Sequence, residues 1–157
     1  MRSLRDIKKN ENSGRHLKFE KVLRYADFPS LDIPLWDTNV ERSEREIFTT
    51  LNWLRKEKRV RKIMALKVLD RMHHPHDEQH IAVVTRELEA EKLEWSYLDM
   101  AISYLSNPDL LNTVTRKKAP PERLTELHLY SSGKRAAVDH WMGPNGVKTL
   151  NKVRASI

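Results

Sequence analysis

The chain has 157 residues, with 29 lysine and arginine residues against 22 aspartate and glutamate residues, a formal net charge of +7. Hydrophobic residues make up 39% and charged residues 32%, a composition typical of one globular domain and not of a disordered chain. The absence of cysteine excludes disulfides, thiol catalysis and cysteine-ligated zinc, and fits a reducing compartment. No run approaches the roughly 18 apolar residues of a membrane span, and no secretory signal is visible at the start. We therefore expect an intracellular, cytoplasmic protein, with the nucleus as the alternative, and no membrane partner.

The first part of the chain, residues 1–40, is expected to form an N-terminal arm that is partly irregular. Pro29 and Pro34 each remove a backbone donor and disfavour helix before them. We predict a short helix over 17–25. The apolar side chains of residues 28–36 are expected to cover the beginning of the domain that follows.

From residue 41 onwards, the spacing of apolar residues predicts helices that alternate with strands. The predicted helices span 41–57, 76–89, 98–106 and 134–142, with a further short helical segment through Leu110, Leu111 and Val114. The predicted strands span 62–69, 92–97, 123–130 and 151–157. Strands and helices that alternate at this spacing predict right-handed crossovers, and hence a parallel sheet whose strands are neighbours in sequence order.

The predicted strands share one apolar pattern, apolar-x-x-apolar-x-apolar, which occurs four times. The four copies are Ile63-x-x-Leu66-x-Val68, Ala90-x-x-Leu93-x-Trp95, Leu124-x-x-Leu127-x-Leu129 and Leu150-x-x-Val153-x-Ala155. Their central residues are 27, 34 and 26 positions apart (66 to 93, 93 to 127, 127 to 153). Self-similarity at this period predicts a short leucine-rich-repeat-like solenoid of the α/β class, with parallel strands alternating with helices.

The repeat domain is expected to span residues 41–157. A parallel sheet with helices on both faces would fit the same alternation, but the strict apolar pattern favours a one-sided, curved sheet. The fourth copy ends at Ile157 without the polar terminal unit that usually covers such a stack, so we predict a domain that is truncated at its C-terminal end.

A one-sided solenoid leaves one face of its sheet open, and polar residues of the predicted strands are the candidates to line it. These candidates are Lys67, Glu94, Glu126, His128, Lys152 and Arg154. Such surfaces bind more often than they catalyse. We therefore predict a non-catalytic protein-interaction or regulatory module that needs no cofactor. Its partner would be another protein or a neighbouring domain.

Three runs of sequence also carry a resemblance to a known family. They are RLTELHLYSSGKRAAVDHW at 123–141, LEWSYLDM at 93–100 and SEREIF at 43–48. Together they resemble a leucine-rich-repeat-like segment of filamentous-fungal multidomain proteins, which commonly precedes a subtilisin-like serine protease domain. The resemblance covers about 41–157 and implies a fragment or stand-alone version of that segment. It carries over no catalytic residue, because the chain has only four glycines and no Gly-Thr-Ser-type nucleophile motif.

A cluster of cations between 55 and 62 offers a different function, binding to nucleic acid or another anionic surface. Its members are Arg55, Lys56, Lys58, Arg59, Arg61 and Lys62. The competing interpretation is a helix that ends in cations, which complement its negative end, followed by a solvated loop. No aromatic platform interleaves the cluster, which favours the second interpretation.

A histidine cluster supports a second alternative, a metal-dependent hydrolase. Its members are His73, His74, His76 and His80. His76 and His80 are four residues apart, a spacing that places two rings on one face of a helix, as in zinc-binding His-x-x-x-His pairs. However, Asp77 stands where the protease motif has glutamate, and Pro75 places His76 at the helix start. Solvated imidazoles in a polar turn are the competing interpretation.

Two further motifs look catalytic but fit their chemistry poorly. Ser131-Ser132-Gly133-Lys134 lies between a strand and a helix, as phosphate loops do, but His128 stands where such a loop needs glycine. We expect a tight turn there, with Gly133 supplying a conformation that other residues disfavour. Asp139 and His140 are adjacent, so on a helix their side chains point about 100° apart and do not form a triad with a serine.

Overall fold

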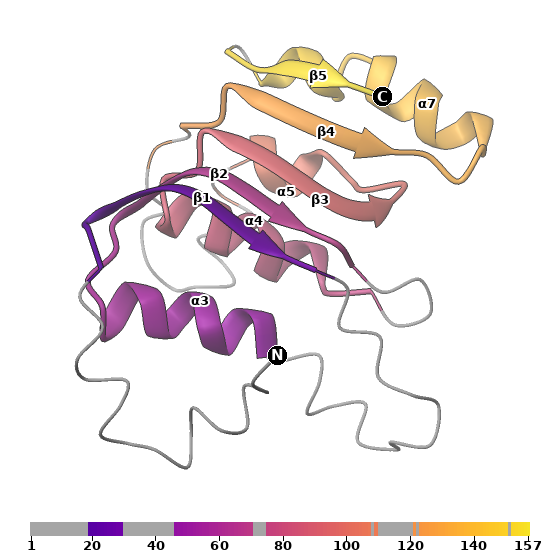
Figure 1. Ribbon diagram of the computed structural model, residues 1–157. Helices are drawn as coiled ribbons and strands as arrows, with labels where there is room; N and C mark the ends of the chain where they lie inside the picture. The colour runs from indigo at the N-terminus through magenta and orange to yellow at the C-terminus, as the bar shows by residue number, and fades with distance from the viewer. Residues whose placement is uncertain are drawn as a thin grey trace, which may run out of the picture.

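A five-stranded parallel β-sheet that alternates with helices forms the framework of the protein (Figure 1). The computed structural model describes residues 19–29, 46–70, 75–107, 109, 121, 123–150 and 152–157. The elements are β1 (Val22–Phe28), α3 (Glu46–Lys56), β2 (Lys62–Val68), α4 (Glu78–Glu87), β3 (Lys92–Leu98), α5 (Ser103–Ser106), β4 (Glu126–Tyr130), α7 (Arg135–Met142), the 3-10 helix η2 (Val147–Thr149) and β5 (Arg154–Ser156). The strands lie in the order β1-β2-β3-β4-β5, each parallel to the next. The predicted α/β class and the parallel sheet in sequence order are confirmed.

The four predicted strands correspond to β2, β3, β4 and β5, while the helix predicted over 98–106 is much shorter than expected. The reason is that β3 continues to Leu98 and that Asp99 then adopts a positive φ of 57°, a left-handed conformation that does not propagate a helix. Only Ser103–Ser106 is helical. The helical segment predicted through 110–114 and the covering residues predicted between 30 and 36 lie outside the described residues.

The short helix predicted over 17–25 is wrong, because β1 occupies this part of the chain. Its apolar residues are Leu23, Ala26 and Phe28, which repeat the apolar-x-x-apolar-x-apolar pattern of the other strands. They pair in register with Ile63, Leu66 and Val68 of β2. Pairing with β2, which is distant in sequence, therefore outweighs the local preference of residues 17–25 for a helix, as tertiary context often does for strands. A strand of the sheet lies within the stretch that was expected to be a partly irregular arm.

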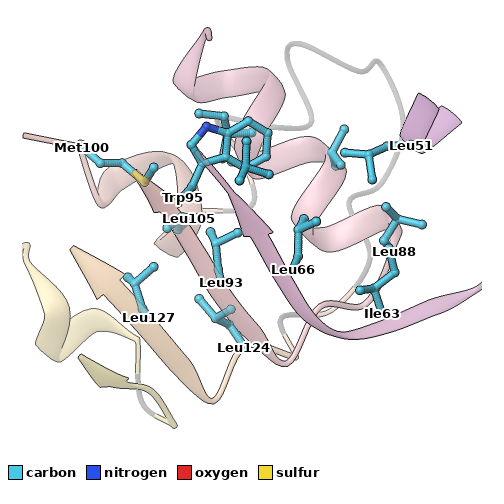
Figure 2. Close-up of a cluster of buried hydrophobic side chains, with 14 of the residues drawn as sticks. Leu51, Ile63, Leu66, Leu88, Leu93, Trp95, Met100, Leu105, Leu124 and Leu127 are labelled. Carbon is cyan, nitrogen blue, oxygen red and sulfur yellow. The ribbon is translucent and has the colours of Figure 1, made fainter. Parts of the chain in front are cut away.

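A row of leucines in register across three strands forms the centre of the core. Leu66 pairs with Leu93, and Leu93 with Leu127, and all three side chains have 0% exposure. Figure 2 shows them on neighbouring strands, with Trp95 and Leu105 nearby. Because successive side chains of a strand point to opposite faces, this row fixes which face of every strand enters the core.

The helices supply the other half of the core from one side of the sheet (Figure 1). Leu51 of α3 and Ile81 of α4 are almost fully buried, and so is Trp141 of α7. The Trp141 indole Nε1 donates a hydrogen bond to the carbonyl oxygen of Met100, 2.8 Å away, which ties α7 to the segment after β3. The buried helix residues belong to the same cluster as the strand leucines, so the described helices pack on one face.

The fourth copy of the apolar pattern does not occupy the predicted position in the sheet. Leu127 of β4 pairs with Ala155 of β5, and not with Val153, so the copy is displaced by two residues. Leu150 is nevertheless buried, because it caps η2 and enters the core from there and not from a strand. A shift of two residues keeps the same side chains on the same face, so the alternation survives it.

Replacing Leu93 with alanine should destabilise the protein strongly, because Leu93 has 0% exposure and lies between Leu66 and Leu127. We expect a loss of about 2–5 kcal/mol in the free energy of unfolding, measured by urea denaturation. Met64→Ala is the matched control, since Met64 lies on the neighbouring strand and is 40% exposed; its cost should stay within about 0.5 kcal/mol. Equal losses in the two variants would contradict the described packing.

Candidate interaction surface

The face of the sheet opposite the helices carries the polar residues that alternate with the core. We call it the open face. Its first row joins Asp27, Lys67, Glu94, His128 and Ser156, each in register with the next across all five strands. Its second row joins Tyr25, Ala65, Lys92, Glu126 and Arg154 in the same way. In the part of the chain that the structure describes, no helix lies over this face (Figure 1).

Glu94 is held by two strands at once. The Lys67 Nζ lies 2.8 Å from the Glu94 Oε1, and the Tyr130 hydroxyl donates a hydrogen bond to the same oxygen at 3.1 Å. The hydrogen bond from Lys67 lowers the pKa of the Glu94 carboxyl below its usual value, and burial opposes this effect. The same contact raises the pKa of Lys67. Burial, followed by the bond to Glu94, raises the pKa of Tyr130.

Glu126 forms the second charged contact of the open face. Its Oε1 lies 2.7 Å from the Lys92 Nζ and 2.7 Å from the His128 Nε2. Hydrogen bonds from Lys92 and then from His128 lower the pKa of the Glu126 carboxyl. The bond to Glu126 raises the pKa of Lys92. Each carboxylate at the centre of the face is therefore satisfied by a lysine and by one further donor.

These contacts suit binding better than proton transfer. General acid–base catalysis at neutral pH needs a group whose pKa lies near the working pH. The pKa values of both central carboxyls, Glu94 and Glu126, are lowered, away from neutral pH, so these groups stay charged there. Their side chains are still 22% and 42% exposed, so a partner in contact with the face would meet charges already held in place.

The structure brings most of the predicted surface candidates together. Lys67, Glu94, Glu126, His128 and Arg154 lie in the two rows of the open face, whereas Lys152 lies in the exposed turn before β5. Sequence reasoning missed Tyr25, Asp27, Lys92 and Tyr130. The first two lie on the unpredicted strand β1, but the alternation about Leu93 would have identified Lys92, which lies two residues before Glu94.

The predicted basic cluster is divided among different environments. Arg55 forms an ion pair with Glu87 at 3.1 Å, and Lys62 forms one with Glu91. Lys58 lies over the Trp53 ring, 4.9 Å from its centroid. The remaining three members are exposed at the end of α3 and in the turn before β2. They are Lys56, Arg59 and Arg61. Half of the cluster is thus engaged within the protein itself.

The two histidines proposed as zinc ligands lie in unlike environments. His76 is 3% exposed, and its Nδ1 lies 2.7 Å from the Asp70 Oδ1, while the other Asp70 oxygen accepts a hydrogen bond from the Trp95 indole at 2.7 Å. The His80 side chain is 62% exposed and its Nδ1 lies 2.8 Å from Asp77. Among the described residues no group of three potential ligands surrounds a metal position, and His73 and His74 lie outside those residues.

The turn after β4 does not offer free donors to a phosphate, because Ser132 is already bound to the Asp99 carboxylate. The Ser132 backbone N–H and hydroxyl both donate to Asp99, and these bonds lower the pKa of the Asp99 carboxyl. A charged carboxylate at this position would repel a phosphate. Gly133 has a φ of 85°, as expected for a tight turn. Asp139 lies 3.6 Å from Arg135 on α7, where both side chains are exposed, and among the described residues no serine is hydrogen-bonded to it as a triad would require.

Comparison of the chain with protein-family models, with curated proteins and with solved structures gave no match in any of the three cases. No described helix combines the length and the apolar character needed to cross a membrane. Any functional proposal therefore rests on the geometry of this chain and on the resemblance found in its sequence.

Replacing His76 with alanine should destabilise the protein, whereas His80→Ala should not. Loss of the His76 ring leaves the buried Asp70 carboxylate without one of its hydrogen-bond partners, for which we expect about 1–3 kcal/mol in urea denaturation. His80 is exposed, so its variant should stay within about 0.5 kcal/mol of the wild type. A shared zinc site predicts a different result, in which the purified protein contains zinc and both variants lose it.

Glu94→Gln should weaken the dependence of stability on acid pH. Because the folded-state pKa of Glu94 is lowered, its ionised form stabilises the fold above the ordinary value of 4.5, and this contribution is lost as pH falls through the lowered pKa. The gap between the urea midpoints at pH 7 and pH 3 should therefore be smaller in Glu94→Gln than in the wild type. Asp139→Asn, at an exposed pair on α7, is the control and should leave the gap unchanged.

Proposed function

We propose that this chain is a non-catalytic interaction module, a short leucine-rich-repeat-like solenoid whose open face binds a protein partner or a neighbouring domain. One observation carries the proposal. The charged residues of the open face are held in cross-strand pairs, Lys67 with Glu94 and Lys92 with Glu126, above a rigid parallel sheet. A surface whose side chains are fixed before binding loses less conformational entropy when the partner arrives.

The repeating packing supports the solenoid part of the proposal. The first apolar position of three successive units, Ile63, Ala90 and Leu124, is almost fully buried in each case. The central positions lie in register across the sheet, and β1 adds a further unit before them. Each of the five described strands pairs with the strand before or after it in the chain, as in stacked repeats. The resemblance to the segment beside fungal subtilisin-like proteases points to the same kind of non-catalytic role.

A protein partner suits the charge of the open face better than nucleic acid does. The lysines at its centre already neutralise Glu94 and Glu126, so the middle of the face presents both signs of charge. Nucleic-acid surfaces present a continuous excess of cations to the phosphates. The exposed members of the basic cluster lie at the end of α3 (Lys56) and in the turn before β2 (Arg59 and Arg61), and not in the two rows of the open face.

The proposal can be tested with a charge swap that keeps the ion pair but inverts the surface pattern. The test variant carries Lys67→Glu together with Glu94→Lys. The matched control exchanges Arg135 and Asp139, an exposed pair on α7, by Arg135→Asp and Asp139→Arg. Binders captured from a cell extract would be purified, and the Kd of each binary complex measured for all three proteins. We expect the open-face swap to weaken binding by about tenfold or more, and the control to leave it unchanged.

Two results would overturn the proposal. The first is a purified complex that survives the open-face swap but is lost in the α7 control. The second is that nucleic acid is the only tight binder, with an affinity that falls steeply with salt, because phosphate contacts release counterions. That second result would favour the cluster around Lys56, Arg59 and Arg61 instead.

A further inference from the structure

A small pocket lies where β4 and β5 begin, apart from the paired centre of the open face. Its volume is about 210 Å³. Its walls are aliphatic and come from Leu105, Leu124, Leu150 and Val153. Ser106, Thr149 and Lys152 complete the lining. The pocket is thus an apolar recess with one ammonium group at its border.

The pocket follows from the way the last strands come together. The pairing of β4 with β5 begins at Glu126 and Arg154, and the Arg154 backbone N–H donates to the Thr125 carbonyl oxygen at 2.8 Å. Leu150 caps η2, and Thr149 donates its hydroxyl proton to the Gly146 carbonyl oxygen at 2.6 Å. The recess lies just before this pairing, between Leu124, Leu150 and Val153, with Leu105 of α5 as a further wall.

The size of the pocket limits what can occupy it. Sites for drug-sized ligands and cofactors usually measure about 300–1,000 Å³. A recess of about 210 Å³ is smaller and suits a single apolar side chain. Such a side chain would contact Leu124 and Val153 and leave its backbone outside.

The charge around the pocket indicates what should flank that side chain. Lys152 lines the recess, and exposed cations precede two of the other lining residues, Arg123 before Leu124 and Lys148 before Thr149. In the described part of the chain, none of these three cations lies within ion-pair distance of a carboxylate. The nearest strand carboxylate in sequence, Glu126, is already bound by Lys92 and His128. Among the described residues, one lysine without a carboxylate partner thus lines the apolar recess, and two further such cations are next to lining residues in the sequence.

We propose that this pocket binds an acidic peptide segment of a protein partner, with one apolar side chain in the recess and flanking carboxylates on Lys152, Arg123 and Lys148. Burial of the side chain supplies the affinity, and the cations select the acidic flanks. This site is separate from the charge rows of the open face. It can therefore exist whether or not the open face binds a partner.

The proposal can be tested by nuclear magnetic resonance titration of the full chain with capped synthetic peptides. The probe is the peptide EELEE, and the comparison peptides are EESEE, which lacks the apolar side chain, and KKLKK, which reverses the flanks. We expect EELEE to shift the amide resonances of Leu105, Leu124 and Val153. EESEE should bind about tenfold more weakly, because one buried aliphatic side chain contributes roughly that factor, and KKLKK should not bind.

Variants separate this site from the rest of the surface. Lys152→Glu should weaken EELEE binding by about tenfold, whereas Lys56→Glu, the same change at the exposed lysine that ends α3, should leave it within about twofold. The Lys67/Glu94 swap should also leave it unchanged, so failure of the open-face proposal would not be mistaken for failure of this one. The pocket proposal is overturned if EELEE causes no shifts at millimolar concentration, if EESEE or KKLKK binds equally well, or if Lys152→Glu has no effect. Binding of octanoate without EELEE would assign the pocket to a fatty acid instead.

Discussion

The parallel register of the strands is the constraint on which the rest of the molecule depends. It places Leu66, Leu93 and Leu127 side by side with 0% exposure. The same pairing, one residue further along each strand, brings Lys67 against Glu94 and so builds the open face. A slip of one residue in any strand would move its charged residues into the core, so the apolar row and the charged rows specify each other. The surface is therefore as well defined as the core beneath it.

One polar cluster within the core connects the end of β2, the residue before α4 and β3. The Asp70 carboxylate follows β2 and accepts hydrogen bonds from the backbone N–H of His76, just before α4, and from the Trp95 indole in β3; the His76 ring lies 2.7 Å from the same carboxylate. The Asp70 backbone N–H in turn donates to the Ser96 hydroxyl. A buried carboxylate is costly unless its oxygens are satisfied, so this group holds the beginning of α4 close to two strands. The histidine spacing that suggests zinc in the sequence serves this structural contact, at least for His76.

Apolar periodicity identified the parallel sheet, but two features depended on information beyond the pattern. The unit Leu23-x-x-Ala26-x-Phe28 has the required spacing, yet its centre is an alanine and its partner Leu66 lies 40 residues further on (26 to 66), outside the period of the other units. At the other end, Leu150 and Val153 have the spacing of a strand, but Leu150 caps η2 and Val153 immediately precedes β5. The residues of the open face could be predicted from their alternation with the strand leucines. Its ion pairs could not, because they depend on the register between strands, which no local stretch of a single sequence specifies.

Formal charge alone is a weak guide to where this protein would attract an anion. The densest run of cations, between 55 and 62, loses Arg55 and Lys62 to Glu87 and Glu91. Lys67 and Lys92 are likewise neutralised on the open face. Arg123, Lys148 and Lys152, near the beginnings of β4 and β5, are fewer, but no described carboxylate pairs with them, and Lys152 lines an apolar recess. An ion pair within the fold weakens the attraction of its cation for an external anion, so local pairing decides where an acidic peptide would bind, while the paired open face suits a partner that presents both signs of charge.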